Sequence, residues 1–293
     1  MKSIIKLNHV SIDYKVYSDG SVGINIPHNA TSDTNFLQCH LLDSQGIFAL
    51  YQILEHLKET NQTTVLSLDY LPFARQDRSQ STAEVFIPNS FKSFVRTLST
   101  YKSEILEIIL VDPHSSFNIE AFKSFDFKVF VIPQLLLLET TLNSFPSEID
   151  YVISPDKGAV LKSLSIADFL QVPLLSANKT RDPITHEVKL EIDCISKIPT
   201  INLENKTILI ADDIIDYGTS IHELTKQLKE KYKGITILVF ISHAILPFNT
   251  RLEIPSRFSY ALQYVDMFNC YNLLPDNTEP SDVDIPINAF NIL

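Results

Sequence analysis

Glycine is scarce in this sequence, so the few glycines that remain are informative. The 293 residues contain six of them, whereas an average usage of about 7% would give roughly twenty. Gly20, Gly158 and Gly218 lie within the motifs described below. Because glycine is the residue that tolerates left-handed backbone and close approach to a ligand, these three positions are candidates for functional turns.

Cysteine, long apolar runs and positive charge are also in short supply. The three cysteines lie far apart and without metal-ligand spacing, which favours buried thiols in a reducing compartment. No apolar run approaches the roughly 18 residues that cross a bilayer, and the first residues do not resemble a secretory signal. The net charge of −11 argues against nucleic acid or an anionic membrane as the main partner. We therefore expect a cytoplasmic protein that acts on small molecules.

Apolar, β-branched segments alternate with amphipathic segments along the chain. This alternation predicts an α/β fold with doubly wound parallel sheets, whose ligands collect at the carboxyl ends of the strands. The predicted strands are 64–70, 105–112, 127–132, 151–154, 206–212 and 235–242. Two sets of such units predict two domains, 1–135 and 136–271. The Pro- and Asp-rich tail, 272–293, is a candidate to pack back on the first half.

Two segments have the apolar periodicity of helices with one buried face. Residues 44–59 place Ile47, Leu50, Tyr51, Leu54 and Leu57 on one face, and residues 220–233 do the same with Ile221, Leu224 and Leu228. Ser220 and Glu223 have the spacing of a capping box, which predicts a helix start at that point.

The stretch KTILIADDIIDYGTSIHE, residues 206–223, combines a strand, an acidic pair and a short loop before that helix. Backbone N–H groups at a helix N-terminus suit a phosphate. Asp212 and Asp213 could accept hydrogen bonds from the two cis hydroxyls of a ribose. The alternative is an ordinary strand–turn–helix junction whose carboxylates face solvent. The combination favours a ribose-phosphate site.

This stretch resembles the PRPP-binding motif that phosphoribosyltransferases share with PRPP synthetases (ribose-phosphate diphosphokinases). The first half favours the synthetases, because LSLDYLPFARQDRS is similar to their Tyr-Ala-Arg-Gln-Asp-Arg segment, which the transferases lack. Further segments resemble the synthetases in the same order along the chain: YSDGSVGINI (17–26), VDPHSS (111–116), SPDKGAVLKSLSIADFL (154–170) and KTRDPITHEV (179–188). The resemblance is to short, phage-type members of the family, and it implies two domains of the phosphoribosyltransferase type.

The resemblance also implies roles for individual residues. It assigns catalysis to Lys179 and Arg181, on a mobile loop, and a magnesium site to His114 and Asp156. It assigns ATP binding to Tyr17, Asp19, Ser21, Arg75, Gln76 and His114. It assigns the ribose phosphate to Asp212, Asp213, Asp216, Tyr217, Gly218, Thr219 and Ser220.

The activity implied is transfer of a diphosphate from ATP to the anomeric hydroxyl of ribose 5-phosphate, with Mg²⁺ as cofactor and AMP as leaving group. Such reactions depend on positioning and charge neutralisation. The family assembles into dimers and hexamers, often with Tyr17 and Asp19 of one subunit at a neighbour's adenine, so the resemblance implies a homo-oligomer.

The sequence departs from the family pattern in three places. Ser21 stands where the family usually has Glu, and the opening strand and helix are shortened or missing. The phosphate loop reads Asp-Tyr-Gly-Thr-Ser where relatives generally have Asp-Thr-Gly-Gly-Thr. Tyr217 and Thr219 thus replace a small hydroxyl residue and a glycine. We therefore also consider a larger acceptor, such as ADP-ribose in an NAD-related pathway.

Two other functions compete with a nucleotide-biosynthetic diphosphokinase. A catalytically silent regulatory subunit would have no physical need for the whole set Arg75, Gln76, His114, Asp156, Lys179 and Arg181. A phosphoribosyltransferase would leave the first half unexplained.

Overall fold

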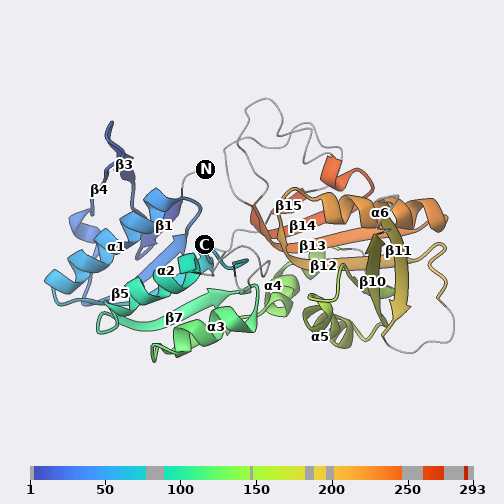
Figure 1. Cartoon of the computed structure of the whole chain (residues 1–293), viewed down its shortest axis with the longest axis horizontal. Helices are drawn as coiled ribbons and strands as arrows, with labels where there is room; N and C mark the ends of the chain where they lie inside the picture. Colours follow the sequence, from blue (N-terminus) through green and yellow to red (C-terminus); the bar gives the residue numbers. More distant parts are fainter. Residues whose placement is uncertain are drawn as a thin grey trace. The chain divides into compact units, whose positions relative to one another are not determined.

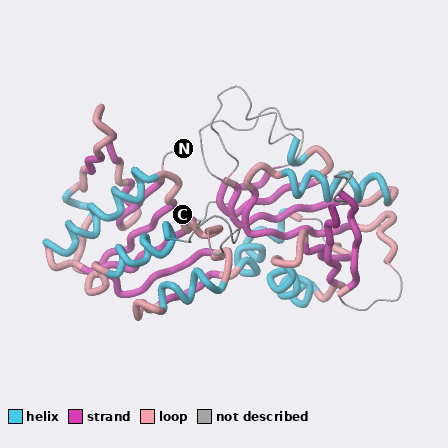
Figure 2. Tube along the Cα trace, viewed as in Figure 1, coloured by secondary structure: helices cyan, strands magenta, loops and turns pink. Residues whose placement is uncertain are grey.

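The computed structural model describes residues 3–76, 89–145, 148–181, 188–195, 201–245, 260–273 and 287–289. The chain divides into two compact units, Met1–Pro133 with Leu293, and Gln134–Ile292. Figure 2 shows that each unit gathers its strands (magenta) into a sheet that helices (cyan) flank. No helix among these described residues is long and apolar enough to cross a membrane.

The first unit is built on a six-stranded sheet with the order β2-β1-β5-β6-β7-β8. Strands β5 to β8 are parallel, and β1 and β2 add antiparallel strands at one edge. A short antiparallel hairpin, β3–β4, stands apart from this sheet. The elements are β1 (Ile4–Leu7), β2 (Val10–Ser11), β3 (Tyr14–Val16), β4 (Val22–Ile24), η1 (His28–Ala30), β5 (Thr34–His40), α1 (Ser44–Glu59), β6 (Thr63–Tyr70), α2 (Asn89–Ser99), β7 (Ile105–Val111), α3 (Ser116–Lys123) and β8 (Val129–Ile132).

The second unit is built on a seven-stranded sheet with the order β11-β10-β9-β12-β13-β14-β15. All of its neighbouring strands are parallel except β11, which runs antiparallel to β10. The elements are α4 (Gln134–Thr141), η2 (Leu142–Ser144), β9 (Tyr151–Ser154), α5 (Val160–Leu170), β10 (Leu174–Arg181), β11 (Val188–Cys194), β12 (Thr207–Ile215), α6 (Thr219–Lys231), β13 (Thr236–Ala244), β14 (Met267–Leu273) and β15 (Ile287–Ala289).

Helices cover both faces of this second sheet. In Figure 1, α6 lies along one face, and α4 and α5 lie along the other. Ile208 and Ile210 of β12 belong to the same apolar cluster as Leu224 of α6. Leu209, between them, is equally buried and faces the other way, because successive strand residues point to opposite faces. Burial on both faces explains why the sequence of β12 is almost continuously apolar.

The predicted α/β class with parallel sheets is confirmed, and both helices predicted from periodicity form. Helix α1 spans the predicted residues, and its buried residues include Ala49 and Ile53 besides the predicted leucines. Ile47 and Tyr51 lie at the margin of that face and are only partly buried. In α6, the predicted residues Ile221, Leu224 and Leu228 are all buried.

Two elements extend beyond the predicted ones. Residues 287–289 of the tail form β15 and pair with β14, so this part of the tail extends the second unit's sheet. The open edge of β14 explains this placement, because an edge strand offers unpaired N–H and C=O groups to an added strand. Strand β12 also runs to Ile215, beyond the predicted end at residue 212, because β13 pairs with it up to that residue.

Candidate functional site

The turn of the β3–β4 hairpin holds the first group of predicted ATP-binding residues. Tyr17 N–H donates to the Ser21 carbonyl at 2.8 Å, and the Tyr17 side chain is 50% exposed. The Asp19 carboxylate accepts from the Ser21 N–H at 3.0 Å and from the Ser21 hydroxyl at 2.7 Å. These hydrogen bonds lower the pKa of Asp19 below its ordinary value. Ser21 therefore orients the ionised Asp19 carboxylate. The replacement of the usual Glu by Ser21 did not predict this local role.

Arg75 and Gln76 lie in the loop that follows β6. Gln76 N–H donates to the Phe73 carbonyl at 2.9 Å and closes a tight turn. Phe73 has a φ of +61°, a left-handed conformation that is costly for a bulky residue. Its ring packs edge-on against Phe94 at 6.4 Å between centroids. The aromatic packing thus holds a strained turn that presents Arg75, and strain of this kind tends to occur at functional sites.

His114 follows the carboxyl end of β7, and a buried asparagine connects its segment to the Arg75 loop. Asn118, in the first turn of α3, donates from its side-chain amide to the Ala74 carbonyl at 3.2 Å. Its oxygen accepts from the Ser115 N–H at 3.0 Å. Asn118 is fully buried, so these bonds hold two predicted ATP-binding segments side by side. Sequence reasoning missed Asn118, whose only signal was its position three residues after Ser115.

Asp156 lies in a turn between β9 and α5. Its Oδ1 accepts from the N–H groups of Gly158 at 2.7 Å and Ala159 at 3.0 Å. The hydroxyl of the buried Ser154 donates to the Asp156 carbonyl at 2.6 Å. The turn therefore fixes the exposed Asp156 carboxylate at the carboxyl end of β9.

Lys179 and Arg181 lie in β10, near the end of the β10–β11 hairpin. Lys179 pairs with Leu190 and Arg181 with Val188 in the antiparallel register. The two residues occupy alternate positions of a strand, which differs from the predicted loop beginning at residue 179. The backbone is extended there because β11 supplies a hydrogen-bonding partner. The remainder of the predicted loop, 182–187, lies outside the described residues.

The acidic pair occupies the sixth and seventh of the nine residues of β12. The Asp213 N–H donates to Oδ1 of Asp212 at 2.9 Å. Burial raises the pKa of Asp212 well above its ordinary value, and the nearby carboxylates of Asp213 and Asp156 raise it further. The amide of Gln134, at the start of α4, donates to the Asp212 carbonyl at 2.6 Å. Strand and turn therefore gather three acidic side chains at the carboxyl ends of β9 and β12.

The loop after β12 leads into α6 with a left-handed glycine. Gly218 has a φ of +72° and is the N-cap residue of α6, which begins at Thr219. The predicted capping box is thus wrong: Ser220 lies inside the helix. Thr219 and Ser220 are exposed, Asp216 is partly buried, and the Tyr217 side chain is 57% exposed. The helix N-terminus and the exposed hydroxyl residues form a place where a phosphoryl group can bind.

The segment that contains Tyr260 and Ala261 packs against this loop and the first turn of α6. The imidazole of His222, in the first turn of α6, stacks on the ring of Tyr260 with 3.7 Å between ring centroids. Its Nδ1 lies 2.5 Å from the Tyr260 carbonyl. His222 is buried, and Tyr260 is 44% exposed. Residue 261 lies so close to Gly218 that a Cβ at position 218 would come within 2.2 Å of the Ala261 Cβ. Tyr260 was not among the predicted site residues.

Replacing Gly218 by alanine is expected to destabilise the protein by about 2–5 kcal/mol. A non-glycine residue in the left-handed region costs roughly 1–2 kcal/mol, and the new methyl group would also clash with Ala261, where overpacking costs a further ~1–3 kcal/mol. The measurement is chemical denaturation. Gly20→Ala is the matched control, because Gly20 has a φ of +83° but nothing lies within 4 Å of its added Cβ. Equal losses in the two variants would contradict this account of the loop.

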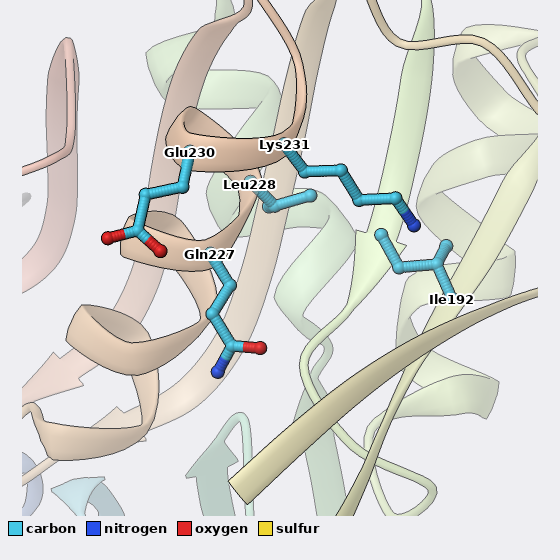
Figure 3. A pocket seen from close by; sticks show the side chains of 5 residues that line it. All are labelled: Ile192, Gln227, Leu228, Glu230 and Lys231. Carbon is cyan, nitrogen blue, oxygen red and sulfur yellow. The ribbon is translucent and has the colours of Figure 1, made fainter.

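A surface pocket of about 270 Å³ lies elsewhere in the second unit. It is lined by Ile192 of β11 and by Gln227, Leu228, Glu230 and Lys231 of α6, and Figure 3 shows Lys231 reaching toward Ile192. The first α6 residue that lines it is Gln227, eight positions after Thr219 at the start of the helix. At about 1.5 Å per residue, this pocket lies roughly 12 Å or more along the helix from the phosphate-binding end. It is separate from the candidate site.

The residues present can be tested for their fit to magnesium. Among the described residues, no three His, Cys, Asp or Glu side chains form a group able to hold a metal. Mg²⁺ commonly takes only one or two carboxylates, with water and substrate phosphates as its other ligands. Asp156 is exposed and, as a carboxylate, keeps acceptor capacity beyond its two backbone bonds. These donors fit magnesium bound together with a phosphate-bearing substrate.

Within each unit, the structure brings several predicted residues together. In the first unit, the Arg75 and His114 segments are joined through Asn118. In the second, Asp156 lies close enough to Asp212 to raise the pKa of its carboxyl group, as the adjacent Asp213 also does. The hairpin with Tyr17 is tied to α1 by the Gln52 amide, which donates to the Val22 carbonyl at 2.8 Å.

The chain is similar in sequence to ribose-phosphate pyrophosphokinases. The enzyme of Saccharolobus solfataricus is 26% identical over 230 residues, which are 77% of this chain and 74% of that protein. The enzyme of Bacillus subtilis is 28% identical over 213 residues, 70% of this chain and 61% of that protein. The family model of the phosphoribosyl transferase domain matches residues 136–247.

The fold of the whole chain is also similar to a solved structure. The phosphoribosylpyrophosphate synthetase from Mycobacterium smegmatis superposes with a TM-score of 0.73 and 20% identity, covering 95% of this chain and 85% of that one. The motifs, the related sequences and the two-unit fold agree. Over most of its length the chain is therefore similar in sequence to ribose-phosphate pyrophosphokinases, and its two-unit fold is that of a PRPP synthetase.

Proposed function

We propose that this enzyme transfers the β,γ-diphosphate of ATP to the anomeric 1-hydroxyl of a ribose 5-phosphoryl acceptor and releases AMP. The general diphosphokinase activity is supported by the ribose-phosphate pyrophosphokinases to which the chain is similar in sequence. The observation that carries the acceptor assignment is the β12–α6 segment, which has two carboxylates followed by a left-handed glycine at a helix N-terminus. We assign the ATP site to the first unit and the ribose-phosphate site to the second.

The acceptor is held at both ends in this proposal. Asp212 and Asp213 accept hydrogen bonds from the 2- and 3-hydroxyls of the ribose. Asp216, Tyr217, Gly218, Thr219 and Ser220 receive the 5′-phosphoryl group at the start of α6. Fixing the sugar at two points orients its 1-hydroxyl, and such positioning supplies a large part of the rate enhancement in a two-substrate reaction.

The chemical step is attack of the acceptor 1-oxygen on the β-phosphorus of ATP. The bond between this phosphorus and the α,β-bridging oxygen breaks, and AMP leaves with that oxygen and its electron pair. The hydroxyl proton is lost to solvent. Arg75 and His114 bind the ATP phosphates, Gln76 binds the nucleoside, and Tyr17, Asp19 and Ser21 lie at the adenine. Lys179 and Arg181 stabilise the negative charge that develops on the transferred and leaving groups.

Magnesium fits this scheme as the cofactor. His114 and Asp156 are the residues that would hold it, with the phosphates and water as its remaining ligands. When bound, Mg²⁺ neutralises phosphate charge and helps align the reacting groups.

We further propose that the acceptor carries more than a phosphate on its 5′ side, as ADP-ribose does. Tyr217 is 57% exposed in the phosphate-binding loop, where relatives have a small hydroxyl residue. Tyr260 is held against the same helix end by its stacking on His222 and is also well exposed. Exposed aromatic rings suit a nucleotide portion, because they offer both an apolar face and a hydroxyl group. ADP-ribose 1-diphosphate would be the product, in an NAD-related pathway.

The double replacement Tyr217→Thr with Thr219→Gly is expected to shift acceptor preference toward ribose 5-phosphate. The ratio of kcat/KM for ribose 5-phosphate over ADP-ribose should rise about tenfold or more, since one lost aromatic stacking contact costs roughly 0.5–1.5 kcal/mol and the added glycine reopens the phosphate cradle. Tyr232→Thr, at the other end of α6, is the control. An unchanged ratio in the double variant would contradict this explanation of the loop.

The proposed function is tested by AMP release from ATP and Mg²⁺, with ribose 5-phosphate and ADP-ribose offered separately. We expect AMP that depends on an acceptor, with one of these two as the preferred substrate. Formation of ADP in place of AMP would mean transfer of a single phosphoryl group and would contradict the proposal. The absence of AMP with both acceptors would contradict it as well.

The setting of the enzyme is proposed on similar grounds. The three cysteines, Cys39, Cys194 and Cys270, are free thiols, which is consistent with a cytoplasmic location. The exposed Tyr17 at the hairpin turn is consistent with a homo-oligomer, a dimer or hexamer, in which this turn serves a neighbouring subunit. The substrates are small molecules, and neither nucleic acid nor membrane is a proposed partner.

A further inference from the structure

A lysine outside the predicted site connects the two acidic segments of the second unit. Lys162 lies in the first turn of α5, the helix that follows the Asp156 turn. Its Nζ is 3.2 Å from Oδ2 of Asp213, and the two side chains are 27% and 10% exposed. Sequence reasoning did not single out Lys162, because a lone lysine in a helix is usually a solvated surface residue.

The position of this ion pair matters because negative charge accumulates around it. Asp212 precedes Asp213 in β12, and the Asp156 carboxylate lies near enough to act electrostatically on Asp212. Like charges at short range in a partly buried site repel one another. The ammonium of Lys162 therefore offsets this repulsion at Asp213 and links α5 to β12.

We propose that Lys162 is a positioning residue for the acceptor, which holds the Asp213 carboxylate in the orientation that binds a ribose hydroxyl. The inference rests on the proposed function of Asp212 and Asp213. A carboxylate has about four lone-pair sites, so one oxygen of Asp213 can bind the ammonium while the other accepts from the sugar. Without the lysine, the partly buried carboxylate of Asp213 would lose this compensating charge. An uncompensated buried charge destabilises its position, so the Asp213 side chain would rearrange.

This role predicts a selective loss of acceptor affinity. In Lys162→Met, the dissociation constant for the preferred acceptor should rise about tenfold or more, because a hydrogen-bonding carboxylate has lost its fixed geometry. Lys162→Arg keeps the charge and should restore most of the affinity. The KM for ATP should stay within about twofold of wild type in both variants, since the proposed ATP-binding residues lie in the other unit.

The chain offers a matched control at the opposite end of the same strand. Lys206 precedes β12, and its Nζ lies 2.8 Å from Oδ1 of Asp150. Lys206→Met removes another Lys–Asp ion pair at the amino end of the sheet, with side chains 43% and 31% exposed, away from the candidate site. This variant should bind the acceptor as the wild type does. An equal loss of affinity in Lys206→Met and Lys162→Met would mean a merely structural role and would overturn the inference.

The test is calorimetric titration of the full chain with ribose 5-phosphate and with ADP-ribose, in the presence of Mg²⁺, beside an assay of the ATP KM. Thermal melting confirms that each variant is folded. A second readout is the double variant Lys162→Met with Asp213→Asn, which should bind no more weakly than Asp213→Asn alone, because the lysine acts through Asp213.

The possible outcomes separate this inference from the proposed function. If Lys162→Met binds the acceptor as tightly as the wild type does, the role of Lys162 is overturned and the proposed function stands. Fully additive losses in the double variant would do the same. A wild type that binds neither acceptor would overturn both. A tenfold loss in Lys162→Met, rescue by arginine and an unaffected Lys206→Met would together support the inference.

Discussion

Replacing Lys179 by alanine is expected to lower kcat for AMP release by about 10²–10³-fold, and Arg181→Ala is expected to do the same. Removing one donor that stabilises transition-state charge typically has this effect. The two cations are proposed to stabilise negative charge that develops only in the transition state. The KM values for ATP and acceptor should therefore change little. The loss should appear with whichever acceptor the wild type prefers.

Lys189→Ala is the control for these two variants. Lys189 lies on the partner strand of the same hairpin and pairs with Thr180, between the two catalytic candidates. We expect its kcat to remain within about twofold of wild type. Steady-state kinetics of AMP formation measures all three variants. If Lys189→Ala lost as much kcat as Lys179→Ala, the effect would come from the hairpin as a whole and not from the two cations.

Asp212→Asn is expected to make the protein more stable at neutral pH and, at the same time, a poorer binder of its acceptor. Burial and the carboxylates of Asp213 and Asp156 raise the pKa of Asp212 well above its ordinary value. Asparagine removes the titrating group, still accepts from the Asp213 N–H and can donate to the Asp213 carboxylate. It loses the charge that accepts a ribose hydroxyl, so the acceptor KM should rise about tenfold or more.

The sign of the pH dependence follows from the raised pKa. The folded protein holds a proton on Asp212 more tightly than the unfolded chain does, so this group lowers the free energy of unfolding as pH rises from about 3.8 through the folded pKa. In Asp212→Asn this decline disappears. The excess stability of the variant should therefore grow as pH rises through this window, and each kcal/mol gained should raise Tm by about 2–4 °C.

Asp150→Asn is the control, because the pKa of Asp150 is lowered where that of Asp212 is raised, so the change in stability should have the opposite sign. Asp150 lies at the amino end of the same sheet, where its carboxylate pairs with Lys206 and accepts from the Thr207 N–H. Partial burial raises the pKa of Asp150, but these two hydrogen bonds and the charge of Lys206 lower it by more, so its pKa lies below the ordinary value. Its replacement should reduce stability above the ordinary Asp pKa and leave acceptor binding unchanged. Thermal melts from pH 4 to 8 compare the two variants, and a destabilised Asp212→Asn at pH 7 would contradict the expected result.

Much of the fold was predictable because it depends on patterns that are local in sequence. The almost continuous apolar run of β12 predicted a strand covered on both faces, and the spacing of Ile221, Leu224 and Leu228 predicted the buried face of α6. Element ends were predicted less well. The extension of β12 to Ile215 depends on β13, and no pattern within residues 206–215 reveals the length of a partner strand.

The site residues were predicted from their segments, whereas the residues that position them were not. Asn118, Gln134 and Lys162 act through contacts with residues 44, 78 and 51 positions away in the chain. Such contacts depend on how the sheets assemble, which a single sequence does not reveal. The capping box at Ser220 was wrong for a related reason. Gly218, which packs closely against Ala261, is the N-cap of α6, so the helix starts two residues earlier than the local motif predicts.

The chemical structure of the product tests the central claim most directly. Phosphorus-31 NMR of a complete reaction, containing enzyme, ATP, Mg²⁺ and the preferred acceptor, distinguishes AMP, free diphosphate and a diphosphate ester on the anomeric carbon. The proposed function predicts equal amounts of AMP and of an acceptor whose 1-oxygen carries two coupled phosphorus atoms. AMP accompanied only by free diphosphate, with the acceptor unchanged, would mean hydrolysis of ATP and would contradict diphosphate transfer.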